Sequence, residues 1–426
     1  MNQNEAISYL LSLASRGWKL GLEKITLLLG ELDNPHTQYP TIHIAGTNGK
    51  GSTSAMIESI LRAAGYRTGL YTSPHLVEMG ERIRLNGQSI SRLELSSYIN
   101  RLQPLFEKYG CTFFEAMTVI ALLYFAEQKV SIAVIEVGLG GRLDATNVIT
   151  PWISIITRID IDHTKQLGKT RRQIALEKAG IIKPGTICIT QNQAEDVSQV
   201  FAQVCQMREA EHFLVTDLVQ IEQVRLGETF STFDATVLDV AYPQLTLALI
   251  GEHQLENAAL ALATIGKLNA RFLRVEKQHV YDGLRRVSWP GRLQVIADHP
   301  KVILDVAHNP NGIATLTQAV RTIFDYQRLI AVFGVCRDKD YRRMVQGLAA
   351  IADSLIAVKA ETDRGLSAQT LARVATRYLT SVHDSQSIDD GFRLALTKAK
   401  PQDLILVTGS HYVVGRVLES YLPSIR

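Results

Sequence analysis

Short apolar runs alternate with amphipathic patterns along residues 40–200 of the chain. The apolar runs are rich in β-branched residues and lack a strict alternation with polar ones, which is typical of parallel strands covered on both faces. Residues 52–65 have apolar positions at helical spacing and stop at Gly65, while the mostly apolar segment 113–128 predicts a buried helix. The predicted strands are 41–46, 66–73, 129–138, 152–159 and 185–190.

A second alternating stretch begins near residue 290. Strands are predicted at KVILDVAH (301–308), RLIAVFGV (328–335), SLIAVKA (354–360) and DLILVTGS (403–410). A helical pattern follows each of them, at 311–324, 339–352, 367–379 and 411–422. Strands that alternate with helices predict a doubly wound parallel sheet with right-handed crossovers.

The residues between these stretches follow another pattern. Within 211–250, three β-rich runs without intervening helices predict a small antiparallel sheet, and an Ala-rich helical pattern follows. The Trp-Pro-Gly sequence within 288–294 is typical of a linker. We therefore predict an α/β protein with two domains, 1–288 and 289–426, of which the first combines a mostly parallel sheet with the small antiparallel one.

Composition narrows the class of protein. Hydrophobic residues make up 46% of the 426 residues and charged residues 20%, which is a globular balance. A net charge of +3 is too close to neutral to favour nucleic-acid or membrane partners. Four scattered cysteines without a C-x-x-C pair argue against disulfides and zinc, and suit a reducing cytosol. Without a signal-peptide pattern or a run of ~18 apolar residues, we expect a soluble cytoplasmic protein.

The segment GTNGKGS, residues 46–52, joins the first predicted strand to the first predicted helix. It departs from the standard phosphate-binding pattern G-x-x-x-x-G-K-[S/T], because Ile44 replaces a glycine and Gly51 follows Lys50 in place of Ser or Thr. Small residues before a helix still let backbone N–H groups approach phosphate oxygens, with Lys50 as a point charge. The segment therefore predicts a nucleotide site, against the alternative of a glycine-rich connection with an incidental lysine.

Two further polar side chains stand where predicted strands end. The Ser73 hydroxyl would suit a hard cation, although most Ser-Pro pairs are simple turns. Glu136 ends a buried-looking strand, where an unpaired carboxylate is costly. Its partner is either Mg²⁺ beside phosphates or an arginine such as Arg142, and this segment leaves both open.

Asp160, Asp162 and His163 cluster just past another strand, at the sheet edge where open α/β sheets bind ligands. His163 is either a metal ligand or an ordinary helix start. Later candidates are equally ordinary when taken singly. Lys178 has the position of a solvated helix lysine, and Asn257 would open the Ala-rich helix, where its amide suits a purine edge.

Three more candidates lie at and beyond the linker. Arg292 is placed to reach across a gap between domains. Asp305 ends a strand, and His308 lies in the His-Asn-Pro turn into the next helix. This turn is a helix cap, part of a ligand site, or both.

Eight motifs together resemble one family: GTNGKGS, TSPHL, EVGLGGRLDATN, DHTKQLG, EKAG, GEHQLENA, WPGRL and DVAHNP. Their order and spacing over about residues 18–416, with KLGLEKI near the start, are similar to the folylpolyglutamate synthase/dihydrofolate synthase family of the Mur-ligase superfamily. Each motif is weak alone, but the ordered set is specific. The resemblance implies an N-terminal Mur-type P-loop ATPase domain and a C-terminal Rossmann-like glutamate-ligase domain.

The resemblance also implies a role for each candidate. Lys50, a carbamylated Lys178 and His308 would be the catalytic groups, and two Mg²⁺ ions would accompany ATP. The metal ligands would be Ser73, Glu136, His163 and Lys178. The ATP-binding residues would be Gly46, Thr47, Asn48, Gly49, Lys50, Gly51, Ser52, Asn257, Arg292 and Asp305. The pterin and folate pocket would contain Leu20, Gly21, Arg82, Thr112, Phe114, Glu115, Leu143, Asp144 and Ala145.

Within that pocket, Phe114 would stack on the pterin, and Asp144 would pair in two places with its amino and N–H groups. The sequence LDATN is similar to the corresponding segment of family members that accept dihydropteroate, so the resemblance favours a bifunctional enzyme. The implied reaction joins L-glutamate to dihydropteroate and to folyl-polyglutamates through an acyl phosphate formed from ATP. The implied partners are these small molecules and reduced folates, with no nucleic acid or membrane, and the protein would be a monomer.

Other interpretations remain open on the sequence. A family member that only extends polyglutamate chains has the same chemistry, and so has a Mur-type ligase acting on a nucleotide-sugar peptide, although Gly51 and LDATN argue against the latter. A P-loop kinase or ATPase would release ADP without depending on glutamate. A non-catalytic relative has no support, because Lys50, Glu136, His163 and Lys178 are all present.

Overall fold

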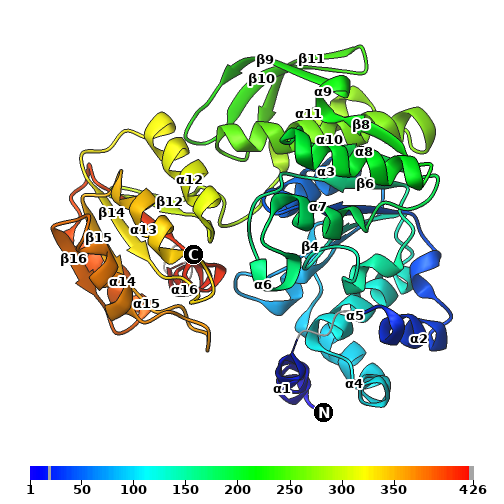
Figure 1. The fold of residues 1–426 in the computed structure, drawn as a ribbon, viewed down its shortest axis with the longest axis horizontal. Helices are drawn as coiled ribbons and strands as arrows, with labels where there is room; N and C mark the ends of the chain where they lie inside the picture. The colour runs from blue at the N-terminus through cyan, green and yellow to red at the C-terminus, as the bar shows by residue number, and fades with distance from the viewer. Residues whose placement is uncertain (18–20, 422–426) are drawn as a thin grey trace.

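The computed structural model describes residues 1–17 and 21–421, which form two lobes (Figure 1). The first lobe holds strands β1–β11, and the second holds β12–β17. Leu20, predicted to lie in the pterin pocket, falls outside the described residues. In the described parts of the chain, no helix is both long and apolar enough to cross a membrane.

An eight-stranded sheet forms the centre of the first lobe, in the order β4-β3-β2-β5-β1-β6-β7-β8. The pairs along β2-β5-β1-β6-β7-β8 are parallel, and β3 and β4 add an antiparallel hairpin at one edge. The bounds are β1 (Thr41–Ala45), β2 (Thr68–Tyr71), β3 (Ile83–Leu85), β4 (Gln88–Ser89), β5 (Ile132–Glu136), β6 (Ile153–Ile156), β7 (Ile187–Thr190) and β8 (Glu211–Leu214). Five of these, β1, β2, β5, β6 and β7, confirm the predicted strands, and each is buried throughout.

Helices cover both faces of this sheet. One face packs against α3, α10 and α11. The other packs against α1, α2, α4 and α5, and at β6 and β7 against α7 and α8, so alternate strand residues enter cores on opposite faces. The predicted buried helix is α5. The helices of this lobe are α1 (Gln3–Ser12), η1 (Leu13–Arg16), α2 (Glu23–Glu31), η2 (Pro35–Thr37), α3 (Lys50–Ala63), η3 (Met79–Arg82), α4 (Arg92–Tyr109), α5 (Phe113–Glu127), η4 (Ala145–Val148), α6 (Thr164–Leu167), α7 (Arg171–Ala179), α8 (Glu195–Met207), α9 (Val215–Leu218), α10 (Glu252–Arg271) and α11 (Lys277–Arg286).

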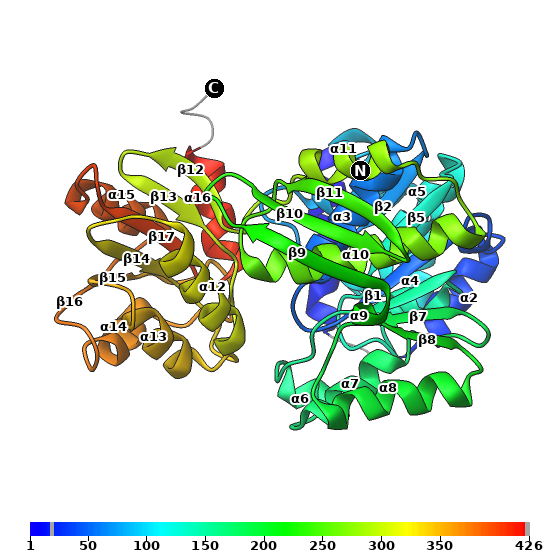
Figure 2. The same cartoon turned by 90° about the horizontal axis from the view of Figure 1, so that it is seen from above.

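The predicted antiparallel sheet is present, in the order β11-β10-β9. Its strands are β9 (Val219–Arg225), β10 (Ser231–Val237) and β11 (Val240–Leu247). Phe233, Leu245 and Leu247 lie in the core that this sheet shares with α10 and α11, so the sheet covers these two helices (Figure 2). The residues before it differ from the prediction, since β8 and α9 precede the first of its strands.

The second lobe contains a six-stranded sheet in the order β12-β13-β17-β14-β15-β16, in which only the edge strand β12 is antiparallel. Helices α12–α14 pack on one face and α15–α16 on the other, which confirms the doubly wound fold. The strands are β12 (Gln294–Asp298), β13 (Lys301–Leu304), β14 (Leu329–Phe333), β15 (Ser354–Ala357), β16 (Ser381–Asp384) and β17 (Leu404–Thr408). The helices are α12 (Pro310–Ile323), α13 (Tyr341–Ala349), α14 (Ala368–Ala375), α15 (Ile388–Lys398) and α16 (His411–Tyr421).

The chain passes from the first lobe to the second along residues 287–293, between α11 and β12. The predicted boundary between residues 288 and 289 lies in this connection. As a division into folding units, it stays a prediction.

Candidate active site

A cleft of about 670 Å³ lies between the two lobes. Every described residue to which the family resemblance assigns a catalytic, nucleotide, metal or substrate role lines this cleft, whereas Asp160 does not. The first lobe contributes the loop after β1 and the segments after β2, β5 and β6, because the carboxyl ends of parallel strands meet at one edge. The second lobe contributes Arg292, Asp305 and His308.

The loop between β1 and α3 is shaped to admit an anion. Gly46 and Gly49 have φ values of 154° and 92°, which favour glycine. A Cβ on Gly46 would lie 1.7 Å from Oγ1 of Thr157, and one on Gly49 would lie 2.3 Å from Oδ1 of Asn257. Helix α3 begins at Lys50 without a side-chain cap, so N–H groups of its first turn can bind phosphate oxygens.

Two lysines, the half-buried Lys50 and the buried Lys178, meet at this loop. Nζ of Lys50 donates to the carbonyl oxygen of Gly46 at 3.0 Å, and Nζ of Lys178, at the end of α7, donates to the same oxygen at 2.7 Å. Burial lowers both pKa values, and the charge of Lys50 helps to bring the pKa of Lys178 to about 7. Lys178 is therefore not the solvated helix lysine that its local sequence suggests, since it is only 4% exposed.

Glu136 stands at the end of β5, next to the strand that leads to Lys50, and is 5% exposed. Its carboxylate accepts the N–H of Ser73 at 3.2 Å, and burial raises its pKa, while the charge of Lys50 opposes that rise. Arg142, the arginine partner left open by the sequence, instead donates to Glu177 at 2.8 Å. Glu136 is therefore a buried carboxylate that faces the cleft without that arginine.

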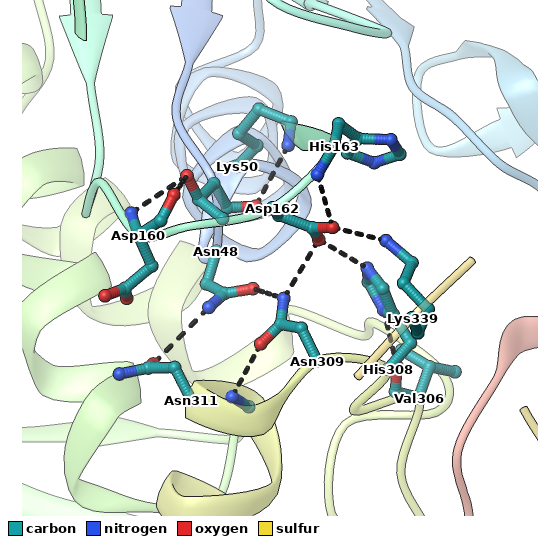
Figure 3. Close-up of polar contacts among 12 residues, drawn as sticks. Asn48, Lys50, Asp160, Asp162, His163, Val306, His308, Asn309, Asn311 and Lys339 are labelled. Carbon is teal, nitrogen blue, oxygen red and sulfur yellow. Dashed lines mark hydrogen bonds and ion pairs between the residues drawn. The ribbon is translucent and has the colours of Figure 1, made fainter. Parts of the chain in front are cut away.

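The three polar residues after β6 point in different directions (Figure 3). Asp160 lies near the guanidinium groups of Arg158 and Arg171, at 3.8 and 3.4 Å. His163 is the N-cap residue of α6, so it is a helix start, and its ring lines the cleft. Burial and the nearby charge of Lys339 lower the pKa of His163 to about 4. A neutral imidazole is the form that binds a metal ion.

Asp162 accepts two of the polar contacts that the second lobe makes to the first at this cleft. Nζ of Lys339 lies 2.6 Å from its Oδ1, and Nδ2 of Asn309 donates to its Oδ2 at 3.2 Å. The same Nδ2 of Asn309 donates to Oδ1 of Asn48 at 3.1 Å, and Nδ2 of Asn48 donates to Asn311 at 3.4 Å. We call these five residues the clasp (Figure 3). Although burial alone would raise the pKa of Asp162, the charge of Lys339 holds it below its usual range.

Three groups of the second lobe face the first across the cleft. Asp305 accepts N–H groups of Leu293 at 3.0 Å and Ala307 at 2.8 Å, and burial raises its pKa against the charge of Arg292. Nδ1 of His308 lies 2.9 Å from the carbonyl oxygen of Val306. Because a carbonyl oxygen only accepts, Nδ1 carries the proton. Burial lowers the pKa of His308 to about 4, which leaves a lone pair on its Nε2, 3.8 Å from Oδ2 of Asp162.

The predicted pterin residues line the part of the cleft near α5. Thr112 and Glu115 form the capping box that starts α5, so both already have local partners. Phe114 packs against Tyr71, with ring centroids 6.1 Å apart. Nε of Arg82, a buried residue, donates to Nδ1 of His75 at 2.8 Å. Gly21, Leu143, Asp144 and Ala145 complete the described set.

Asp144 differs from its predicted role in one respect. Its Oδ2 accepts the N–H of Leu139 at 2.8 Å, and its Oδ1 accepts the N–H and hydroxyl of Thr146 at 3.1 and 2.5 Å. Both oxygens thus hold the loop after β5 together. A pterin that paired with Asp144 in two places would have to share them.

Asn257 lies within α10 and does not open it, because the preceding Glu-His-Gln segment is already helical from Glu252. Its Nδ2 donates to Gln254 at 3.0 Å, which directs the amide toward Gly49. The second lobe's half of the clasp was also missed. The signals were the asparagines of HNPN and the charged RDKD segment, each directly after a strand at the sheet edge that binds ligands.

Comparison with known proteins places this geometry among ligases. Residues 44–265 match the family described as Mur ligase middle domain, and residues 291–411 match Mur ligase, glutamate ligase domain. The chain is 35% identical over 412 residues to the dihydrofolate synthase/folylpolyglutamate synthase of Bacillus subtilis (strain 168), which covers 94% of this chain and 95% of that protein.

Two solved structures are similar along nearly the whole chain. Mycobacterium tuberculosis folylpolyglutamate synthase complexed with ADP and AMPPCP aligns with a TM-score of 0.93 at 30% identity, covering 98% of this chain and 99% of that one. A bifunctional folylpolyglutamate synthase/dihydrofolate synthase with Mn, AMPPNP and L-glutamate bound aligns with a TM-score of 0.87 at 32% identity, covering 97% of each chain.

Proposed function

The chain belongs to the dihydrofolate synthase/folylpolyglutamate synthase family of Mur ligases, and from this premise we propose how its cleft performs ATP-dependent glutamate ligation. The enzyme is an ATP-dependent carboxylate–amine ligase. Its acceptors are dihydropteroate, which becomes dihydrofolate, and folyl-polyglutamates, which gain one residue. ATP transfers its γ-phosphoryl group to the acceptor carboxylate, giving an acyl phosphate and ADP. The amine of L-glutamate then attacks the acyl carbon, and phosphate leaves as the amide forms.

One observation carries this proposal. Lys50, Glu136 and Lys178 of the first lobe face His308 of the second lobe across a single cleft. The loop 46–52 offers N–H groups to phosphates, while Arg292 and Asp305 can contact the nucleoside from the other side. A triphosphate and a carboxylate can therefore meet in a site that the two lobes shield from water, which protects an acyl phosphate from hydrolysis.

Two Mg²⁺ ions fit the donor set by its chemistry. Glu136 is a buried carboxylate, and a cation beside it offsets the cost of its burial. Among the described residues, no group of three or more His, Cys, Asp or Glu could hold a metal alone. Ser73, Glu136 and His163 would therefore share the ions with phosphate oxygens and with the two oxygens of a carbamate on Lys178. When bound, the ions neutralise charge on the transferred phosphoryl group.

The side chains of the cleft divide the remaining work. The ammonium of Lys50, at the N-terminus of α3, attracts the β- and γ-phosphates. Nε2 of His308 carries a lone pair, which can accept a hydrogen bond from the glutamate amine and hold it toward the acyl carbon. The Lys178 amine, with a pKa of about 7, is neutral often enough to react with carbon dioxide. Phe114 and its neighbours hold the pterin end.

The test is an assay with purified protein, Mg-ATP and labelled L-glutamate, offered dihydropteroate or tetrahydrofolate. We expect labelled product with both acceptors and ADP release that depends on glutamate. Product from tetrahydrofolate alone would reduce the function to polyglutamate extension. ADP release independent of glutamate, or activity only with a nucleotide-sugar peptide, would contradict the proposal.

Asp144→Ala tests the pterin pocket. If Asp144 also contacts the pterin, which both acceptors carry, its loss should raise the KM of each acceptor about tenfold and leave the KM of ATP unchanged. Thr146→Val is the matched control, because it removes a donor to Asp144 and keeps the carboxylate. Acceptor KM values that change no more than in Thr146→Val would assign Asp144 to the loop alone.

Lys339→Met tests the clasp. This substitution removes the ammonium group that pairs with the Asp162 carboxylate. The closed arrangement of the two lobes should therefore weaken, and kcat/KM for glutamate should fall about tenfold. The radius of gyration from small-angle X-ray scattering with Mg-ADP should increase. Arg343→Met, which breaks an exposed ion pair on the next turn, should change neither quantity. A Lys339→Met protein that behaves like Arg343→Met would contradict this role.

A further inference from the structure

The backbone conformation of Gly51 does not explain why this residue is a glycine. Unlike Gly46 and Gly49, it has no positive φ and is the second residue of helix α3. A glycine inside a helix is less favourable than alanine, because it has more conformational freedom to lose on folding. The absence of a side chain at this position therefore requires a steric explanation.

The indole of Trp289 supplies that explanation. A Cβ on Gly51 would lie 2.8 Å from Nε1 of Trp289, 3.0 Å from Cζ2 and 3.1 Å from Cε2. The ring cannot easily move away, because the guanidinium carbon of Arg84 lies 4.9 Å from its centroid and the ring packs on the core of the first lobe. The indole thus occupies the space that a side chain at position 51 would need.

Trp289 belongs to the connection between the lobes. Two residues further along, the carbonyl oxygen of Gly291 accepts the N–H of Val306 at 3.0 Å, and the N–H of Gly291 donates to Gln294 at 2.9 Å. One short segment therefore contacts the phosphate-binding loop through a side chain and the second lobe through its backbone.

We propose that Trp289 is a positioning residue, which fixes the first turn of α3 under the nucleotide phosphates and ties that turn to the position of the second lobe. Lys50 directly precedes Gly51, so a displaced Gly51 would also displace the lysine. Because the indole occupies the side-chain space at position 51, Gly51 stands where the standard phosphate-binding pattern has Ser or Thr. This inference rests on the proposed ATP site, and its test measures nucleotide binding without folate or glutamate.

The experiment is a double-mutant cycle on Gly51 and Trp289, read out as the Kd for Mg-ADP by titration calorimetry. In the wild-type background, Gly51→Ala should weaken binding about tenfold, because the new methyl group meets the ring. In a Trp289→Ala background, the ring is gone, so the same change should cost about twofold or less. Equal costs in the two backgrounds would overturn the proposal.

Trp152→Leu is the matched control, because Trp152 is another partly buried tryptophan packed on the same core. Gly51→Ala should cost the full tenfold in that background. If Trp289→Ala melts below the assay temperature, Trp289→Val takes its place in the cycle. A wild-type protein that did not bind Mg-ADP would contradict the proposed function, whereas binding with an additive cycle would overturn only the role of Trp289.

A spectroscopic readout checks the same contact. The sequence contains three tryptophans, so Trp18→Phe with Trp152→Phe leaves Trp289 as the only indole. Mg-ADP should shift the emission of this indole, and Gly51→Ala should remove the shift. Emission that Mg-ADP leaves unchanged would count against any link between Trp289 and the nucleotide.

Discussion

Lys50→Ala should lower ATP-dependent product formation about 100- to 1,000-fold, because a preorganised charge at a transferred phosphoryl group contributes that much. The lysine is half-buried, donates to the carbonyl oxygen of Gly46, and starts the helix whose N-terminus faces the cleft. A second effect adds to the loss. The charge of Lys50 lowers the pKa of Lys178, so its removal raises that pKa and leaves less neutral amine for a carbamate.

The measurement is kcat/KM for ATP in the coupled ligase assay, with a thermal melt to show that the variant is folded. Lys165→Ala is a suitable control, since Lys165 is an exposed lysine of the nearby helix α6. It should retain near-normal activity. A folded Lys50→Ala protein with comparable turnover would remove Lys50 from the phosphate site.

Lys178→Ala should lose at least about 100-fold in activity, because a carbamate there would complete the metal site. Added formate or acetate should restore part of the activity by placing a carboxylate in the vacated space. Lys178→Arg is the informative comparison, since it keeps a cation but cannot form a carbamate, and short carboxylates should not rescue it. The measurement is turnover against carboxylate concentration for both variants.

Two results would contradict this account of Lys178. One is equal rescue of the alanine and arginine variants. The other is a crystal structure of the active enzyme with an unmodified amine at this position. In that case, the bond from Lys178 to the carbonyl oxygen of Gly46 would be its whole role.

The sequence predicted the central strands because each is a continuous apolar run covered on both faces, as in β1 and β5. It did not reveal β12 and β16, which are edge strands with half-exposed residues and no such run. The β3–β4 hairpin was missed although its signal was present. Asn86 and Gly87 both have positive φ, as a two-residue turn of this type requires.

The sequence predicted those site residues that lie at or just after the carboxyl ends of the predicted strands. Glu136 ends one parallel strand and His163 follows another, so topology alone brings them to one edge. The clasp was not predictable, because the contact between Asp162 and Lys339 depends on how two lobes face each other. The reason for a glycine at position 51 was not predictable either. It is the contact with the indole of Trp289, which only the structure shows.

The measurement that tests the central claim most directly is an oxygen-transfer experiment with dihydropteroate labelled with ¹⁸O in its carboxylate. If the cleft activates that carboxylate as an acyl phosphate, one labelled oxygen should appear in each inorganic phosphate released when L-glutamate is added. Unlabelled phosphate from an enzyme that still makes dihydrofolate would contradict the account.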